Sequence, residues 1–166
     1  MKQQTPLTIT GGRLVTPDGV REGALRLVDG RIEAIGSEAQ DGDEIVDASG
    51  RLVAPGLVDL GVFAIDKPAF HFGGITRAAL MPDQSPPLDL PSRVNYIAKS
   101  GKPDFWVHPI AAATRGLQGA EMAEMGLMQA AGAKAVGTGR QWIADSGVML
   151  RVLTYANGLG LTLIAH

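Results

Sequence analysis

Short apolar runs alternate with segments of helical periodicity from residue 56 to residue 165. A run that is apolar at nearly every position is typical of a strand buried on both faces, as in a parallel sheet. A strand followed by a helix, repeated along the chain, predicts parallel βα units. We expect strands at residues 56–63, 75–81, 105–111, 133–136 and 161–165, and helices at residues 92–99, 120–131 and 145–157.

One connection is too short for this pattern. Only eleven residues separate Phe63 from Ile75, and they include Pro68 and the pair Gly73-Gly74. A crossover between parallel strands usually needs a dozen or more residues, including its helix. We therefore expect the first crossover helix to be absent or reduced to a turn.

The first 56 residues form a different pattern of short strands joined by turns. Pro17-Asp18-Gly19 and Asp29-Gly30 are turn signals, because proline presets φ and glycine accepts a positive φ. We also expect Gly11-Gly12 to turn the chain between two strands. The sequence thus predicts two domains, a small β-sandwich-like module at residues 1–56 and an α/β domain at residues 57–166.

Charge and composition exclude several classes of function. The formal net charge is −2, which gives no electrostatic footprint for nucleic acid or an anionic membrane. The absence of cysteine excludes disulfides, thiolate zinc sites and cysteine nucleophiles. No apolar run approaches the roughly 20 residues that a membrane span needs, and residues 1–10 lack a signal-peptide pattern. We expect a cytoplasmic protein that binds neither nucleic acid nor membrane.

Several motifs occur in the order and at the spacing of one family. Residues 46–60, VDASGRLVAPGLVDL, resemble the entry to an amidohydrolase. Residues 73–76, GGIT, leading to residues 81–83, MPD, resemble the dihydroorotase segment Gly-Gly-x-Thr … Met-Pro-Asn. The series is completed by residues 111–119, 124–126, 145–149 and 164–166. Over almost its whole length, the chain resembles dihydroorotases of the amidohydrolase superfamily.

The resemblance implies a (β/α)8 TIM barrel beside the small β module, with the active site at the carboxyl ends of the strands. This chain would then hold about the first five barrel strands. Five strands leave two open edges and an uncovered core. We expect an oligomer or complex in which a partner covers them, either the missing remainder of the barrel or another copy of the chain.

The residues that the resemblance assigns to metal binding are missing. It implies hydrolysis of a cyclic amide by zinc-bound hydroxide, with the zinc held by His-x-His on the first barrel strand. That triplet is Gly61-Val62-Phe63 here, and neither glycine nor phenylalanine can ligate zinc. Gly137-Thr138-Gly139 stands where a bridging carboxylated lysine or an aspartate is expected. We expect no catalytic residue, no bound metal and no other cofactor.

Three further positions follow from the resemblance. The substrate-binding arginine of the family falls near Ile65. Asp83 replaces the family's substrate-binding asparagine, and its carboxylate would repel an anionic substrate. His166 alone matches a family ligand, at the end of the fifth strand, and a single histidine does not make a zinc site.

Other residues have both a structural and a functional interpretation. His71 is a conceivable replacement ligand, but we expect Phe70 and Phe72 beside it to plug the barrel mouth. Lys134 is a conceivable bridging ligand that comes too early in its strand, and residues 137–139 could imitate a phosphate-binding turn. We expect packing roles for a hydrogen-bonded core histidine, two tryptophans and a methionine stripe, namely His108, Trp106, Trp142, Met122, Met125 and Met128.

The resulting hypothesis is a degenerate dihydroorotase-like protein of pyrimidine biosynthesis. We expect a non-catalytic structural partner, for example of aspartate transcarbamoylase, because the lost motif looks like that of family members with such a role. The alternative is an active, zinc-dependent cyclic amidohydrolase whose site is rebuilt from His71, His166 and residues outside the chain. A third possibility is a remnant with no role of its own.

Overall fold

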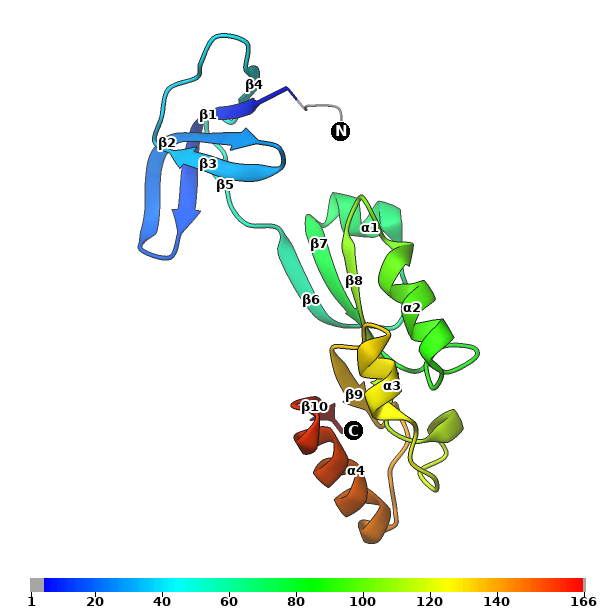
Figure 1. The fold of residues 1–166 in the computed structure, drawn as a ribbon. Helices are drawn as coiled ribbons and strands as arrows, with labels where there is room; N and C mark the ends of the chain where they lie inside the picture. The colour runs from blue at the N-terminus through cyan, green and yellow to red at the C-terminus, as the bar shows by residue number, and fades with distance from the viewer. Residues whose placement is uncertain (1–4, 166) are drawn as a thin grey trace. The chain divides into compact units, whose positions relative to one another are not determined.

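The computed structural model describes residues 5–165, and the chain divides into two compact units between Pro55 and Gly56 (Figure 1). The first unit contains a five-stranded sheet with the order β3-β2-β1-β4, in which β5 also pairs with β1. β1 is antiparallel to β2 but parallel to β4 and β5. The strands are β1 (Leu7–Thr16), β2 (Gly19–Val28), β3 (Arg31–Ile35), β4 (Glu44–Asp47) and β5 (Leu52–Val53).

The turn expected at Gly11-Gly12 is wrong, because β1 continues through both glycines as one ten-residue strand. The register of β1 against β2 shifts between Ile9 and Gly12, and Gly11 has a φ of +70°. A β-bulge with glycine in the left-handed region absorbs an extra residue without reversing the chain. The two glycines therefore bend a strand where a hairpin was predicted.

A charged group is buried inside this module. Arg26 Nε and Nη2 donate to the two carboxylate oxygens of Asp43 at 2.8 and 2.9 Å, and Thr8 Oγ1 donates to Asp43 Oδ2 at 2.7 Å. Arg26 also pairs with Glu33. The hydrogen bond from Arg26, assisted by that from Thr8, holds the pKa of Asp43 well below its usual range. This pairing ties β1, β2 and the loop before β4 together.

The second unit contains a parallel five-stranded sheet with the order β10-β9-β8-β7-β6. Its strands are β6 (Leu57–Val62), β7 (Ile75–Leu80), β8 (Trp106–Ala112), β9 (Ala135–Gly137) and β10 (Thr162–Ile164). The helices are α1 (Lys67–Phe72), α2 (Pro91–Ser100), α3 (Met125–Ala130) and α4 (Ser146–Gly158), with a short 3-10 turn η1 at Arg115–Leu117. The predicted fold class, a partial barrel preceded by a β module, is confirmed.

The first crossover is a helix, so the expectation of an absent helix or a mere turn is wrong. α1 is capped by Asp66, whose carboxylate accepts from Ala69 N at 3.0 Å, and Pro68 lies in its first turn. Proline is tolerated there because the first helical N–H groups have no intrahelical partner. Six residues are enough because Gly73-Gly74 leads directly into β7.

Phenylalanines in α1 do not plug a barrel mouth. Phe70 is buried and meets Phe105 edge to face, with ring centres 5.0 Å apart. Phe72 is 89% exposed. Since α1 connects to the start of β7, both rings lie near the amino ends of the strands, opposite to the edge where the site was expected. The prediction failed because no helix was expected at these residues. In a helix, side chains two positions apart point in different directions.

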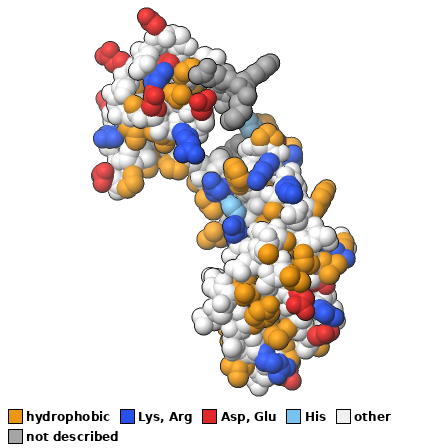
Figure 2. Space-filling model, viewed as in Figure 1, with side chains coloured by type: hydrophobic (Ala, Val, Ile, Leu, Met, Phe, Trp, Pro, Cys, Tyr) orange, Lys and Arg blue, Asp and Glu red, His pale blue; other side chains and the backbone are white. Residues whose placement is uncertain are grey.

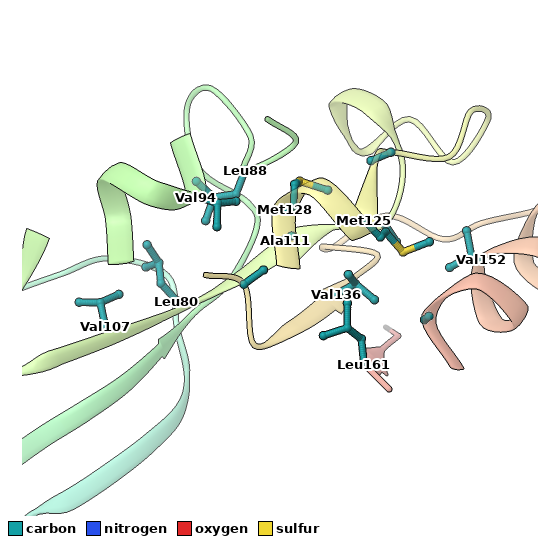
Figure 3. Packing of buried hydrophobic residues seen from close by; sticks show 14 of the residues in the cluster. Leu80, Leu88, Val94, Val107, Ala111, Met125, Met128, Val136, Val152 and Leu161 are labelled. Atoms are coloured by element: carbon teal, nitrogen blue, oxygen red, sulfur yellow. The ribbon is translucent and has the colours of Figure 1, made fainter. Parts of the chain in front are cut away.

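The main core lies between the sheet and its helices (Figure 3). Met125 and Met128 of α3 are fully buried, which confirms two members of the predicted stripe, whereas Met122 is partly buried and precedes the helix. Their fully buried partners include Ala78, Leu80, Val94, Ala111, Val136 and Val152. None of the helices within residues 5–165 is long and apolar enough to cross a membrane.

Candidate functional site

The carboxyl ends of the barrel strands meet along one edge of the sheet. Backbone bonds hold neighbouring ends together. Met81 N donates to Val62 O at 2.9 Å, Ala113 N to Gly137 O at 2.9 Å, and Thr138 N to Ile164 O at 3.0 Å. Ligand sites of such barrels lie at this edge. The candidate site is therefore formed by the residues that follow β6, β7, β8 and β9.

An arginine and a phenylalanine stack at this edge. The guanidinium carbon of Arg140, in the loop after β9, lies 4.1 Å from the centre of the Phe63 ring, which follows β6. Gln84 Nε2 donates to Phe63 O at 3.1 Å and to Met81 O at 3.0 Å. The stack thus bridges the ends of β6 and β9, with the end of β7 fixed between them. Sequence reasoning missed Arg140, because no local pattern links it to Phe63.

Asp83 is turned toward the same loop. Its Oδ1 accepts from Arg140 N at 2.8 Å. A Cβ at Gly139, which has a φ of +68°, would lie 2.8 Å from that oxygen, so only glycine lets the loop come this close. Asp83 Oδ2 is buried and has no hydrogen-bond partner among residues 5–165. The carboxylate predicted at the substrate position thus orders the loop that carries Arg140.

Two threonine hydroxyls are buried beside this edge. Thr114 Oγ1 accepts from Gly119 N at 3.1 Å, and Thr138 Oγ1 donates to Gly139 O at 3.2 Å. Both hydroxyls are neutral and engaged with backbone. They shape the loops after β8 and β9 but offer no charge to a ligand.

The residues at this edge do not fit a zinc ion. Zinc is held by three or four thiolate, imidazole or carboxylate ligands. Gly61, Phe63 and residues 137–139 supply none of these, and the carboxylate of Asp83 is a single ligand group that already accepts from Arg140 N. The positive charge of Arg140, held over Phe63, opposes a second cation at the same place. Within residues 5–165, no three His, Cys, Asp or Glu side chains are grouped so that they could hold a metal.

The other candidate ligands lie away from this edge. His71 lines a pocket of about 420 Å³ with Lys67 and Asp104 at the amino end of β7, and Lys134 precedes β9. His166 lies outside the described residues, although it follows the carboxyl end of β10 in the chain. His71 therefore lies at the end of the sheet opposite to the candidate site. Ile65 packs partly buried against the core.

Three predicted packing residues are more exposed than expected. Trp106 is 45% and Trp142 is 71% exposed, so the prediction of packing roles is wrong for these two tryptophans. His108 is half-buried, and its Nε2 lies 3.4 Å from Arg77 Nη1. Trp106 and His108 belong to β8 and lie on the sheet face that no helix of this unit covers. Apolar and aromatic composition alone did not distinguish the covered face from the open one.

Comparison with known proteins adds a resemblance in sequence. No protein-family model matches the chain. The dihydroorotase of Pelotomaculum thermopropionicum is 38% identical over 177 residues, which cover 96% of this chain and 41% of that protein. The dihydroorotase of Citrifermentans bemidjiense is 34% identical over 179 residues, covering 96% and 42%. The chain spans about two fifths of the length of these curated relatives.

Among solved structures, the L-hydantoinase (dihydropyrimidinase) from Arthrobacter aurescens superposes on the chain with a TM-score of 0.78 at 21% sequence identity. The superposition covers 98% of this chain and 41% of that one. At this identity the likeness supports the fold, namely the β module and the partial barrel in the same order.

Proposed function

We propose that this chain, dihydroorotase-like in sequence and amidohydrolase-like in fold, serves pyrimidine biosynthesis as a cytoplasmic structural subunit that does not hydrolyse a cyclic amide. The observation that carries the proposal is the stack of Arg140 on Phe63. A metal-activated hydroxide needs anionic or imidazole ligands at this edge. A guanidinium on a phenyl ring offers the opposite charge and no ligand atom.

The structural role requires a partner. Leu57 and Leu60 of β6 are exposed, and within the described residues β6 and β10 each pair on one side only. Exposed apolar side chains beside unpaired strand edges are typical of surfaces that another polypeptide covers. We propose that the barrel is completed by polypeptide outside this chain and that the completed protein binds aspartate transcarbamoylase.

Size-exclusion chromatography with aspartate transcarbamoylase tests this role. We expect the purified protein to co-elute with that enzyme at micromolar concentration, and expect EDTA in the buffer to change nothing, because no metal takes part. Elution in separate peaks would contradict the structural role. Zinc-dependent hydrolysis of dihydroorotate by the purified protein would instead support the alternative of a rebuilt active site.

A further inference from the structure

A group of basic side chains lies on the open face of the barrel sheet. Side chains alternate along a strand, so Ala78 and Val107 point to the helices while Arg77, Trp106 and His108 point to the other face. In the register of β7 with β8, Arg77 lies opposite Trp106. The group occupies the amino-terminal part of the strands, away from the carboxyl-end site described above.

The members of this group are in contact. Arg77 Nη1 lies 3.4 Å from His108 Nε2, and its guanidinium carbon lies 5.5 Å from the centre of the Trp106 ring. Lys102 Nζ lies 4.3 Å from the same ring. The pKa of His108 is lowered mainly by burial, and the positive charges of Arg77 and Lys134 lower it further. Lys134 N donates to Pro109 O at 3.0 Å, which brings this lysine's backbone beside the residue that follows His108. We call Arg77, Lys102, His108 and Lys134 the basic cluster.

No carboxylate neutralises the basic cluster within residues 5–165. None of the ion pairs in this part of the chain includes Arg77, Lys102 or Lys134. Asp104, which follows Lys102 by two residues, pairs with Lys67 at 3.7 Å. Figure 2 shows several blue Lys and Arg side chains gathered on one part of the surface of this unit.

We propose that the polypeptide that completes the barrel docks on this face through acidic side chains that pair with the basic cluster. The inference rests on the proposed function, in that it requires a covering partner, and it adds the chemistry of that partner. Covering the face with apolar side chains alone would remove several unpaired cations from water, which is costly. Carboxylates opposite Arg77 and Lys134 offset that cost and select the partner.

Two polypeptides could cover this face, namely the one that completes the barrel and a second copy of this chain. Charge distinguishes between them. A second copy that met this face in a two-fold arrangement would bring one basic cluster against another. Like charges brought together at an interface disfavour the complex. An acidic segment of a different sequence has no such conflict. The completing polypeptide is therefore the partner that we propose for this face, and repulsion disfavours self-association through it.

A binding experiment with a defined probe tests this. The probe is the part of the Pelotomaculum thermopropionicum dihydroorotase outside its 177 aligned residues, co-expressed with this chain and then dissociated and reassociated for affinity measurement. The double variant Arg77→Gln/Lys134→Gln removes two charges of the cluster. Arg151→Gln is the matched control, because Arg151 is an exposed arginine of the same unit on α4. Circular dichroism verifies that each variant folds.

We expect the double variant to bind about tenfold more weakly or worse, and expect added NaCl to weaken the wild type much more than the variant. The NMR pKa of His108 should rise on complex formation, since a carboxylate favours the imidazolium. Equal affinity of wild type and double variant would overturn the inference while leaving the completing partner intact. No complex at all would overturn the completion itself. Tighter self-association of the double variant would identify a second copy as the occupant.

Discussion

The guanidinium carbon of Arg140 lies 4.1 Å from the ring centre of Phe63, although 77 positions separate the two residues in the chain. The resemblance to dihydroorotases assigns the position of Phe63 to a metal ligand. On the proposed function, a side-chain cation held by an aromatic face takes the place of an imidazole–metal contact. The stack links the ends of β6 and β9 and offers no ligand atom for a metal.

A double-mutant cycle measures that link. We expect Phe63→Ala and Arg140→Ala to be coupled by about 0.5–1 kcal/mol in unfolding free energy, the range for a cation–π contact at an exposed site. Urea denaturation followed by tryptophan fluorescence reports on this unit, because both tryptophans belong to it. A pairing of Phe63→Ala with Arg151→Ala should give no coupling. Zero coupling for Phe63 with Arg140 would mean that the stack contributes no stability.

Phe70 and Phe72 of α1 test the orientation of this helix, because one ring is buried and the other is exposed. We expect Phe70→Ala to cost about 3–5 kcal/mol, because it removes a buried ring that packs on Phe105. Phe72→Ala should stay within about 0.5 kcal/mol, because that side chain is exposed. Chemical denaturation of both variants measures the two losses in free energy of unfolding. Similar losses for the two would contradict the orientation of α1.

The loop that carries Arg140 depends on Gly139. Alanine at this position combines a left-handed backbone with a close approach to Asp83 Oδ1, so we expect Gly139→Ala to cost about 1–3 kcal/mol. Gly158→Ala serves as the control at the end of α4, where a Cβ meets nothing within 4 Å. Alanine favours helix, so that variant should be neutral or stabilised by up to about 1 kcal/mol. Thermal melts that rank the two variants the other way would refute this account of the loop.

Acid should weaken the β module through Asp43. Its pKa in the folded chain is lowered, chiefly by the hydrogen bond from Arg26, relative to a reference value of 3.8. As pH falls below that reference, the unfolded chain takes up the proton first, so the stabilisation is complete above it and is lost as pH drops toward the folded pKa. Asp43→Asn should be less stable at neutral pH and should change less with acid.

NMR amide signals of residues 7–47 provide the measurement, because residues 1–55 contain no aromatic side chain for fluorescence. Asp41→Asn, an exposed neighbour, is the control and should follow the wild type. An acid profile of Asp43→Asn that matches the wild type would show that the pairing with Arg26 does not control stability in acid.

Local patterns were sufficient to locate the barrel strands. Continuous apolar runs predicted β6 and β7 to within a residue or two, because strands of a parallel sheet lack the polar alternation that marks other strands. The same reasoning failed at α1. The connection of eleven residues, which includes Pro68, was judged too short for a helix, although after the capping Asp66 this proline lies in a first turn that tolerates it.

At the candidate site, only the lack of metal-ligand atoms was predictable from the sequence. Gly61 and Phe63 were recognisable as residues without ligand atoms, because ligand chemistry depends on residue type alone. The stack of Arg140 on Phe63 and the bond from Arg140 N to Asp83 depend on contacts between distant segments. Neither leaves a periodic or local signal. The exposure of Trp106 was equally hidden, because strand alternation does not tell which face helices will cover.

Zinc content tests the central claim most directly. The protein is purified after expression in zinc-supplemented medium, desalted, and analysed by inductively coupled plasma mass spectrometry. We predict zinc far below one ion per chain, since no three His, Cys, Asp or Glu side chains within residues 5–165 are grouped so that they could hold a metal. Stoichiometric zinc that is lost on substitution of His166 but retained in a surface control such as Arg151→Gln would contradict the account.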